Sequence, residues 1–145
     1  MIIVDTGFWV AFFNRRDTYH DLARQCVPRL QEPMMTTLPV VTETCYLLQQ
    51  RARIPVMLAF VGALRQGGSQ IFQIHDTMLM RIEALMHQYA NLPMDFADAS
   101  LVILAEALGH GRILSTDERD FQTYRWKNHY PFENQDVFKR QFPAQ

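Results

Sequence analysis

The sequence contains little of what would indicate a disulfide-stabilised, zinc-binding or strongly basic protein. Only two residues are cysteine, Cys26 and Cys45, and their separation matches no metal-binding motif. We expect both to be small buried side chains in a protein of the reducing cytoplasm. The formal net charge is −1, from 14 basic and 15 acidic residues, which argues against strong non-specific binding of nucleic acid through a basic surface.

Long apolar runs are also absent. No segment approaches the roughly 18–20 consecutive apolar residues that cross a bilayer, and no basic region precedes the apolar start MIIVD. We therefore expect neither a membrane span nor a secretion signal. The 145 residues suffice for one hydrophobic core. We predict a single domain over residues 1–145, in which the aromatic and charged segment 125–145 has no interpretable pattern.

Short apolar runs alternate with helical patterns along the chain. Strands are expected at residues 2–4, 34–38, 70–75 and 112–116. Helices are expected at 5–14, from Thr18 or His20 to about Gln31, from Pro39 to just before Pro55, at 56–65, from Asp76 or Thr77 to about Tyr89, at 97–108, and from Asp117 to Phe121. This alternation predicts an α/β fold with a mainly parallel sheet.

Four acidic residues follow the ends of predicted strands or begin the helices of this sheet. In a parallel sheet these positions share one edge, so we expect the four side chains to meet there. The helical spacing of neighbouring apolar residues indicates that two of them point inward. Buried carboxylates repel one another unless a proton or cation intervenes, and Mg²⁺ or Mn²⁺ prefers such oxygen ligands. The predicted ligands are Asp5, Glu43, Asp98 and Asp117.

Two further acids near these positions have more than one interpretation. Asp95 is either an additional or supporting metal residue or simply the N-cap of the helix that follows. For Asp120, a capping or supporting role is favoured over direct metal binding. The sequence alone leaves both alternatives open.

The segments IIVDTGFW, PVVTETCYLL, MDFADASLVILAE and ILSTDERDF, in this order, resemble the PIN-domain ribonucleases. The likeness is to VapC-like toxins of bacterial toxin–antitoxin pairs in particular, and it spans roughly residues 1–124. It implies a three-layer α/β/α sandwich with a central, mainly parallel sheet. Gly7 is a departure, because many members have Ser or Asn at that position.

The resemblance also implies a function for each matched position. The four acids correspond to the family's metal-binding quartet, Thr6 and Ser115 match hydroxyl positions beside it, and Asp120 lies where a further acid is common. Members cleave RNA with Mg²⁺ or Mn²⁺, and VapC-like members form homodimers that a small antitoxin protein inhibits. The chain is therefore expected to be a metal-dependent endoribonuclease and the toxin of such a pair.

A mechanism follows from this expectation. Asp5, Glu43 and Asp98 would hold the principal ion, and Asp117 would complete its site or help to hold a second ion. A metal-activated water would cut the phosphodiester bond and leave 5′-phosphate and 3′-hydroxyl ends. For Phe8 and Trp9, a place in the core is favoured over base stacking. Candidate RNA contacts are Arg15, Arg16, Arg51, Arg53 and Arg119.

Other classes of function fit the sequence less well. The main alternative is a non-catalytic PIN-like module that binds RNA or protein. A phosphoacceptor receiver domain also gathers acids at a sheet edge, but it needs a nearby lysine, and here Lys127 and Lys139 both follow the last predicted strand. The sequence contains neither of the glycine-rich phosphate-binding motifs of nucleotide-binding folds.

Overall fold

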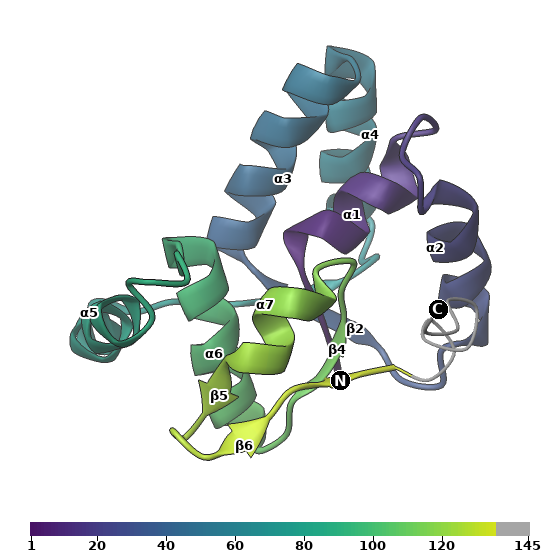
Figure 1. The fold of residues 1–145 in the computed structure, drawn as a ribbon. Helices are drawn as coiled ribbons and strands as arrows, with labels where there is room; N and C mark the ends of the chain where they lie inside the picture. The colour runs from purple at the N-terminus through teal and green to yellow at the C-terminus, as the bar shows by residue number, and fades with distance from the viewer. Residues whose placement is uncertain (136–145) are drawn as a thin grey trace.

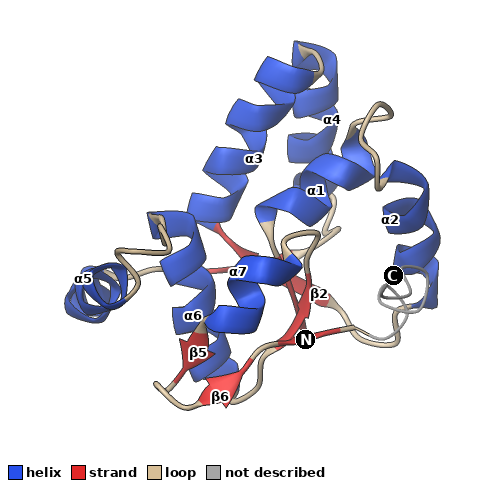
Figure 2. Cartoon of the chain, in the orientation of Figure 1, coloured by secondary structure: helices blue, strands red, loops and turns tan. Residues whose placement is uncertain are grey.

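A five-stranded parallel sheet forms the centre of the computed structural model, which describes residues 1–135 except for the side chains of residues 118 and 119. The strand order is β3-β2-β1-β4-β7, and every neighbouring pair is parallel. Helices flank the sheet (Figures 1 and 2). The predicted α/β/α architecture is confirmed. The strands are β1 (Ile2–Val4), β2 (Met34–Thr37), β3 (Gln70–Phe72), β4 (Arg112–Leu114) and β7 (Glu133–Asn134).

Helices follow the strands in the predicted alternation. None of the helices within residues 1–135 is both long and apolar enough to cross a membrane. The α3–α4 pair extends away from the strands (Figure 2). The helices are α1 (Thr6–Phe13), α2 (His20–Cys26), η1 (Val27–Arg29), α3 (Leu38–Arg51), α4 (Ile54–Arg65), η2 (Asp76–Met78), α5 (Leu79–Gln88), α6 (Phe96–Leu108) and α7 (Glu118–Thr123), where η denotes a 3₁₀ helix.

The hydrophobic core is built around the central strand β1 and α6, and buried residues of α1 and α3 also belong to it. All three residues of β1 are fully buried, as expected for a strand covered on both faces. In α6, Ala97 and every residue from Ala99 to Ala105 are buried, and Gly109 ends the helix in the left-handed conformation with φ of 76°. This burial holds the start of α6 at the carboxyl edge of the sheet.

A buried hydroxyl pair fixes α6 against the end of β2. The hydroxyls of Thr37 and Ser100 share a hydrogen bond of 2.6 Å, and Ser100 donates its proton to the carbonyl oxygen of Ala97 at 2.6 Å. Thr37 is therefore the donor to Ser100. The Thr37 oxygen also accepts a hydrogen bond from the N–H of Val40 and so caps α3. One residue thus positions the beginnings of both helices.

Several boundaries differ from those predicted because local capping and turn residues intervene. The second strand ends at Thr37, not Leu38, since Thr37 caps α3. The helix expected to reach Gln31 ends at Cys26, and a 3₁₀ turn containing Pro28 follows. The third and fourth strands end at Phe72 and Leu114, before the predicted 75 and 116.

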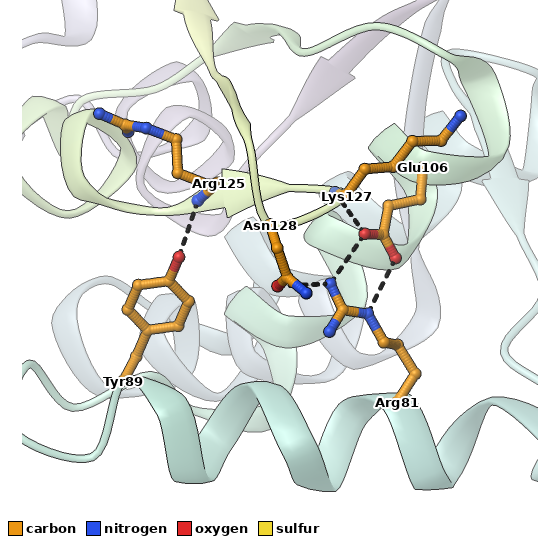
Figure 3. Close-up of polar contacts among 6 residues, drawn as sticks. All are labelled: Arg81, Tyr89, Glu106, Arg125, Lys127 and Asn128. Carbon is orange, nitrogen blue, oxygen red and sulfur yellow. Dashed lines mark hydrogen bonds and ion pairs between the residues drawn. The ribbon is translucent and has the colours of Figure 1, made fainter.

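The segment after Tyr124 carries structure that the sequence did not indicate. Residues Arg125–Trp126 (β5) and Tyr130–Pro131 (β6) form an antiparallel hairpin, and β7 then joins β4 as the fifth strand of the main sheet. Glu106 of α6 holds the hairpin, accepting hydrogen bonds from Arg81 of α5 and from the N–H of Lys127 (Figure 3). The hairpin is therefore fastened to two helices.

Candidate functional site

Asp5 lies at the point where β1 ends and α1 begins. Its Oδ1 caps α1 by accepting a hydrogen bond of 2.9 Å from the N–H of Phe8, and its Oδ2 accepts a hydrogen bond from the hydroxyl of Ser115. The side chain is buried. Burial raises the pKa of Asp5 to about 7, with smaller contributions from the carboxylates of Asp117 and Glu43.

Ser115 connects Asp5 with the loop that follows β4. It is fully buried, and its oxygen accepts a hydrogen bond of 2.9 Å from the N–H of Asp117. The Asp117 carboxylate is solvent-exposed and accepts a hydrogen bond of 3.3 Å from the N–H of Asp120, so Asp117 caps α7. Since β1 and β4 are neighbouring parallel strands, Asp5 and Asp117 lie at the same sheet edge.

Glu43 reaches this edge from α3. The hydroxyl of Thr6 donates a hydrogen bond of 3.4 Å to its carboxylate, which ties the second turn of α3 to the start of α1. Burial raises the pKa of Glu43, and the nearby Asp95 carboxylate raises it further. The inward direction predicted for this side chain agrees with its half-buried position.

Asp98 and Asp95 cap α6 reciprocally. Asp95 accepts a hydrogen bond of 2.8 Å from the N–H of Asp98, and Asp98 accepts one of 3.2 Å from the N–H of Asp95. Asp95 is therefore the N-cap of α6, and its role toward a metal stays a prediction. Burial, and then the charge of Asp95, raises the pKa of Asp98. Asp98 also receives a hydrogen bond of 3.5 Å from the buried Tyr124 hydroxyl, a contact that the sequence interpretation missed.

The acids share one electrostatic environment but do not form a ready chelating set. Asp117 and Glu43 raise the pKa of Asp5, and Glu43 raises that of Asp98. Within residues 1–135, however, no three His, Cys, Asp or Glu side chains are arranged to hold a metal ion. Helix capping accounts for the lack of a metal-binding arrangement, because the oxygens of Asp5, Asp98 and Asp117 are directed toward backbone N–H groups.

Four of the five predicted RNA contacts line a groove that contains none of these acids. Arg15, Arg16, Arg51 and Arg53 are exposed and line one groove of about 770 Å³, whose lining residues include none of the acids described above. The side chain of Arg119 lies outside what the structure describes. Phe8 and Trp9 are 0% and 4% exposed, so both belong to the core, as favoured from the sequence.

Comparison with known proteins places this arrangement in a family. The sequence model of the PIN domain matches residues 2–127. The chain belongs to the PIN-domain family. This PIN domain is 24% identical over 124 residues to ribonuclease VapC26 of Mycobacterium tuberculosis, a match that covers 86% of this chain and 92% of that protein.

A solved structure shows the same fold. The crystal structure of Mycobacterium tuberculosis VapC20, described as a toxin that cleaves the sarcin–ricin loop, superposes on this PIN domain with a TM-score of 0.75. The match has 22% sequence identity and covers 82% of this chain and 92% of that chain. The likeness extends over most of both chains and confirms the fold derived from the strand order.

The chemistry of the acidic residues fits a divalent cation. All candidate donors are carboxylate or hydroxyl oxygens, the ligand type that Mg²⁺ and Mn²⁺ prefer. The pKa values of Asp5, Glu43 and Asp98 are all raised, each partly by another acid of the same group. A cation near these carboxylates would offset both their burial and their mutual repulsion.

Proposed function

We propose that this PIN domain is a metal-dependent endoribonuclease and the toxin of a toxin–antitoxin pair. The observation that carries the proposal is the electrostatic coupling of Asp5, Glu43, Asp98 and Asp117 at one sheet edge. The ribonuclease and toxin descriptions of the two relatives support it. Such a protein would work in the cytoplasm and bind RNA as its substrate.

The metal-holding residues in this proposal are Asp5, Glu43 and Asp98, with Asp117 completing the site or helping to hold a second ion. When bound, Mg²⁺ or Mn²⁺ supplies charge neutralisation at the phosphate and activation of the attacking water. No side-chain nucleophile is required. The expected products therefore carry 5′-phosphate and 3′-hydroxyl ends.

The neighbouring hydroxyl groups orient the carboxylates. Ser115 donates to Asp5, Thr6 donates to Glu43, and Tyr124 donates to Asp98. Each hydroxyl comes from a segment distant in sequence from the acid it contacts. We assign these three residues positioning roles, because side chains locked by such contacts lose less freedom when a ligand binds.

An apolar surface beside the acids is evidence for the proposed protein partner. Leu38, Tyr46 and Phe96 are 53%, 61% and 38% exposed, and with Glu43 and Asp95 they line a hollow of about 840 Å³. Exposed apolar side chains grouped in this way are typical of protein contacts. A small antitoxin that brings an Arg to the acids would match the site in charge, and the homodimer expected from the sequence is part of the same proposal.

One observation favours a second candidate, a non-catalytic PIN-like module that binds RNA or protein. Among the described side chains no group of three is arranged to hold a metal. A binding module would need no such group. Metal binding therefore separates the two candidates.

The deciding experiment combines cleavage with metal titration. Purified protein is incubated with mixed cellular RNAs with and without Mn²⁺, alongside the Asp5→Asn variant, and the RNA ends are sequenced. We expect Mn²⁺-dependent cuts with 5′-phosphate ends in the wild type only. Equal cleavage by Asp5→Asn, or calorimetric Mn²⁺ binding unchanged by Asp98→Ala, would contradict the assignment.

A further inference from the structure

A basic groove lies at the ends of α1 and α3 that are farther from the sheet. We define the arginine groove by Arg15, Arg16, Arg24, Arg51 and Arg53, all exposed, which line a hollow of about 770 Å³. These are five of the fourteen Lys and Arg residues of the chain. Within residues 1–135, no Asp or Glu is found among the residues that line the hollow, and no ion pair of the described residues involves any of the five arginines.

Two turns bring these arginines together from separate parts of the sequence. In the turn after α1, the Asn14 side chain accepts a hydrogen bond of 3.1 Å from the N–H of Arg16. On the other side, α3 ends at Arg51 and Arg53 is the N-cap of α4. Each turn therefore contributes two arginines to one hollow, and α2 adds Arg24.

Aromatic side chains anchor one wall of the groove to the core. Phe12 and Phe13 both line it, and the guanidinium of Arg24 lies 4.6 Å from the ring centroid of Phe12. Phe13 packs edge-on against the buried Phe60 at a centroid distance of 5.5 Å. The groove thus combines guanidinium groups with partly exposed aromatic rings on a rigid support.

The positive charge of the groove favours an anionic ligand. Guanidinium groups do not lose their protons in proteins, so five of them in one hollow repel one another. The flat fork of Arg matches phosphate oxygens in pairs, and its face also stacks on bases and aromatic rings. Phosphodiesters with unpaired bases therefore fit this surface better than an acidic peptide, which would leave the aromatic wall unused.

Two helices connect the groove with the acidic site. Asp5 caps the start of α1 and Asn14 its end, while Glu43 lies early in α3 and Arg51 is its last residue. At the helical rise, the eight residues from Glu43 to Arg51 span about 12 Å. A bound strand of a few nucleotides could therefore contact both the acids and the groove.

We propose that the arginine groove binds the phosphodiester backbone of single-stranded RNA to one side of the nucleotide at the acidic site. This inference rests on the proposed RNA substrate but not on catalysis. The groove would supply affinity that is independent of base sequence, whereas the acids would act on one phosphate. It explains how a chain with a net charge of −1 can hold a polyanion next to a group of carboxylates.

The test measures RNA affinity across a salt series in the full chain carrying Asp5→Asn, with EDTA present and RNA integrity checked on a gel, so that binding is measured on uncut RNA. The probe is a labelled single-stranded RNA of about 12 nucleotides, within the range that a single domain contacts. The test variant is Arg51→Gln/Arg53→Gln. The matched control is Arg29→Gln/Arg65→Gln, because these two residues are also exposed and lie at helix ends but do not line the groove.

We expect the test variant to lower the slope of log affinity against log salt by about 1.4, since each lost contact to a single strand contributes about 0.7. Affinity should fall by roughly tenfold or more at moderate salt for the same reason. The control variant should match the parent in both quantities. Circular dichroism melting of all three proteins verifies that each is folded.

Two outcomes would overturn the inference. One is an unchanged slope and affinity in the test variant, whether or not the wild type cleaves RNA. The other is tight binding of a polyglutamate peptide that depends on Arg51 and Arg53 while RNA binding does not, which would assign the groove to an acidic peptide. If the wild type fails to cleave with Mn²⁺ but the slope falls as expected, the groove assignment stands and the ribonuclease proposal fails.

Discussion

The hydroxyl of Ser115 donates a hydrogen bond to the carboxylate of Asp5, although the two residues are 110 positions apart in the sequence. The Ser115 oxygen also accepts a hydrogen bond from the N–H of Asp117. Ser115 therefore connects the ends of two adjacent strands and leaves the Asp5 carboxylate with a hydrogen bond to each oxygen. The placement of Asp5 relative to Asp117 therefore depends on this side chain.

Replacing Ser115 by Ala should impair both stability and activity. Asp5 would lose the hydrogen bond that lowers its pKa, leaving a buried carboxyl oxygen without a partner. We expect a loss of about 1–2 kcal/mol in the free energy of unfolding and a higher apparent pKa for Mn²⁺-dependent cleavage. Urea unfolding and pH–rate profiles would measure these changes. Ser69→Ala, at a buried serine that bonds only to a neighbouring carbonyl oxygen in the described structure, should leave the pH–rate profile unchanged.

The stability of the metal-free protein should fall as the pH rises. Burial raises the pKa of Asp5 from 3.8 to about 7, so the folded protein retains a proton that the unfolded chain releases. This stabilising contribution is complete below about pH 4 and is lost as the pH rises through 7. Thermal melts in EDTA should show it, and Asp5→Asn should reduce the pH dependence. Added Mn²⁺ should raise Tm more at high pH than at low pH; equal shifts would argue against metal binding by Asp5.

Glu32 should have the opposite pH dependence. Its carboxylate receives two hydrogen bonds from Arg112 and pairs with the N-terminal amine, and the Arg112 hydrogen bond is the largest of the causes that lower its pKa to about 2. The resulting stability is present above 4.5, the ordinary pKa, and is lost as the pH falls through about 2. Glu32→Gln should reduce stability by about 1 kcal/mol at neutral pH. The difference in free energy of unfolding between wild type and variant, measured by chemical denaturation, should shrink in acid. A difference that stays the same at low pH would contradict this account.

Gly7 should not tolerate Ser, because the space beside it is occupied. A Cβ at position 7 would collide with the Thr116 hydroxyl and would also contact Asp5. We expect Gly7→Ser to reduce the free energy of unfolding by about 1 kcal/mol or more through overpacking. The double variant Gly7→Ser/Thr116→Ala should recover most of this loss. Equal melting temperatures for the two variants would show that Thr116 is not the obstacle.

The boundaries and strands that sequence patterns predicted well are those with strong local signals. The β-branched run of β1, the proline Pro39 near the start of α3 and the terminating Gly109 each determine an element within a few residues. The fifth strand, β7, has only two residues and no alternation to detect. It exists because Glu133 and Asn134 pair with β4 and because the hairpin before it is held by Glu106, neither of which is a local property.

The sequence by itself determined that four carboxylates come to one edge of a parallel sheet, because strand–helix alternation and crossover handedness place strand ends together. Only the tertiary structure decided where their oxygens point, since Ser115, Thr6 and Tyr124 approach them from remote segments. It also decided that arginines from two separate turns share one groove. Side-chain direction and surface grouping depend on long-range packing, which residue spacing along the chain does not contain.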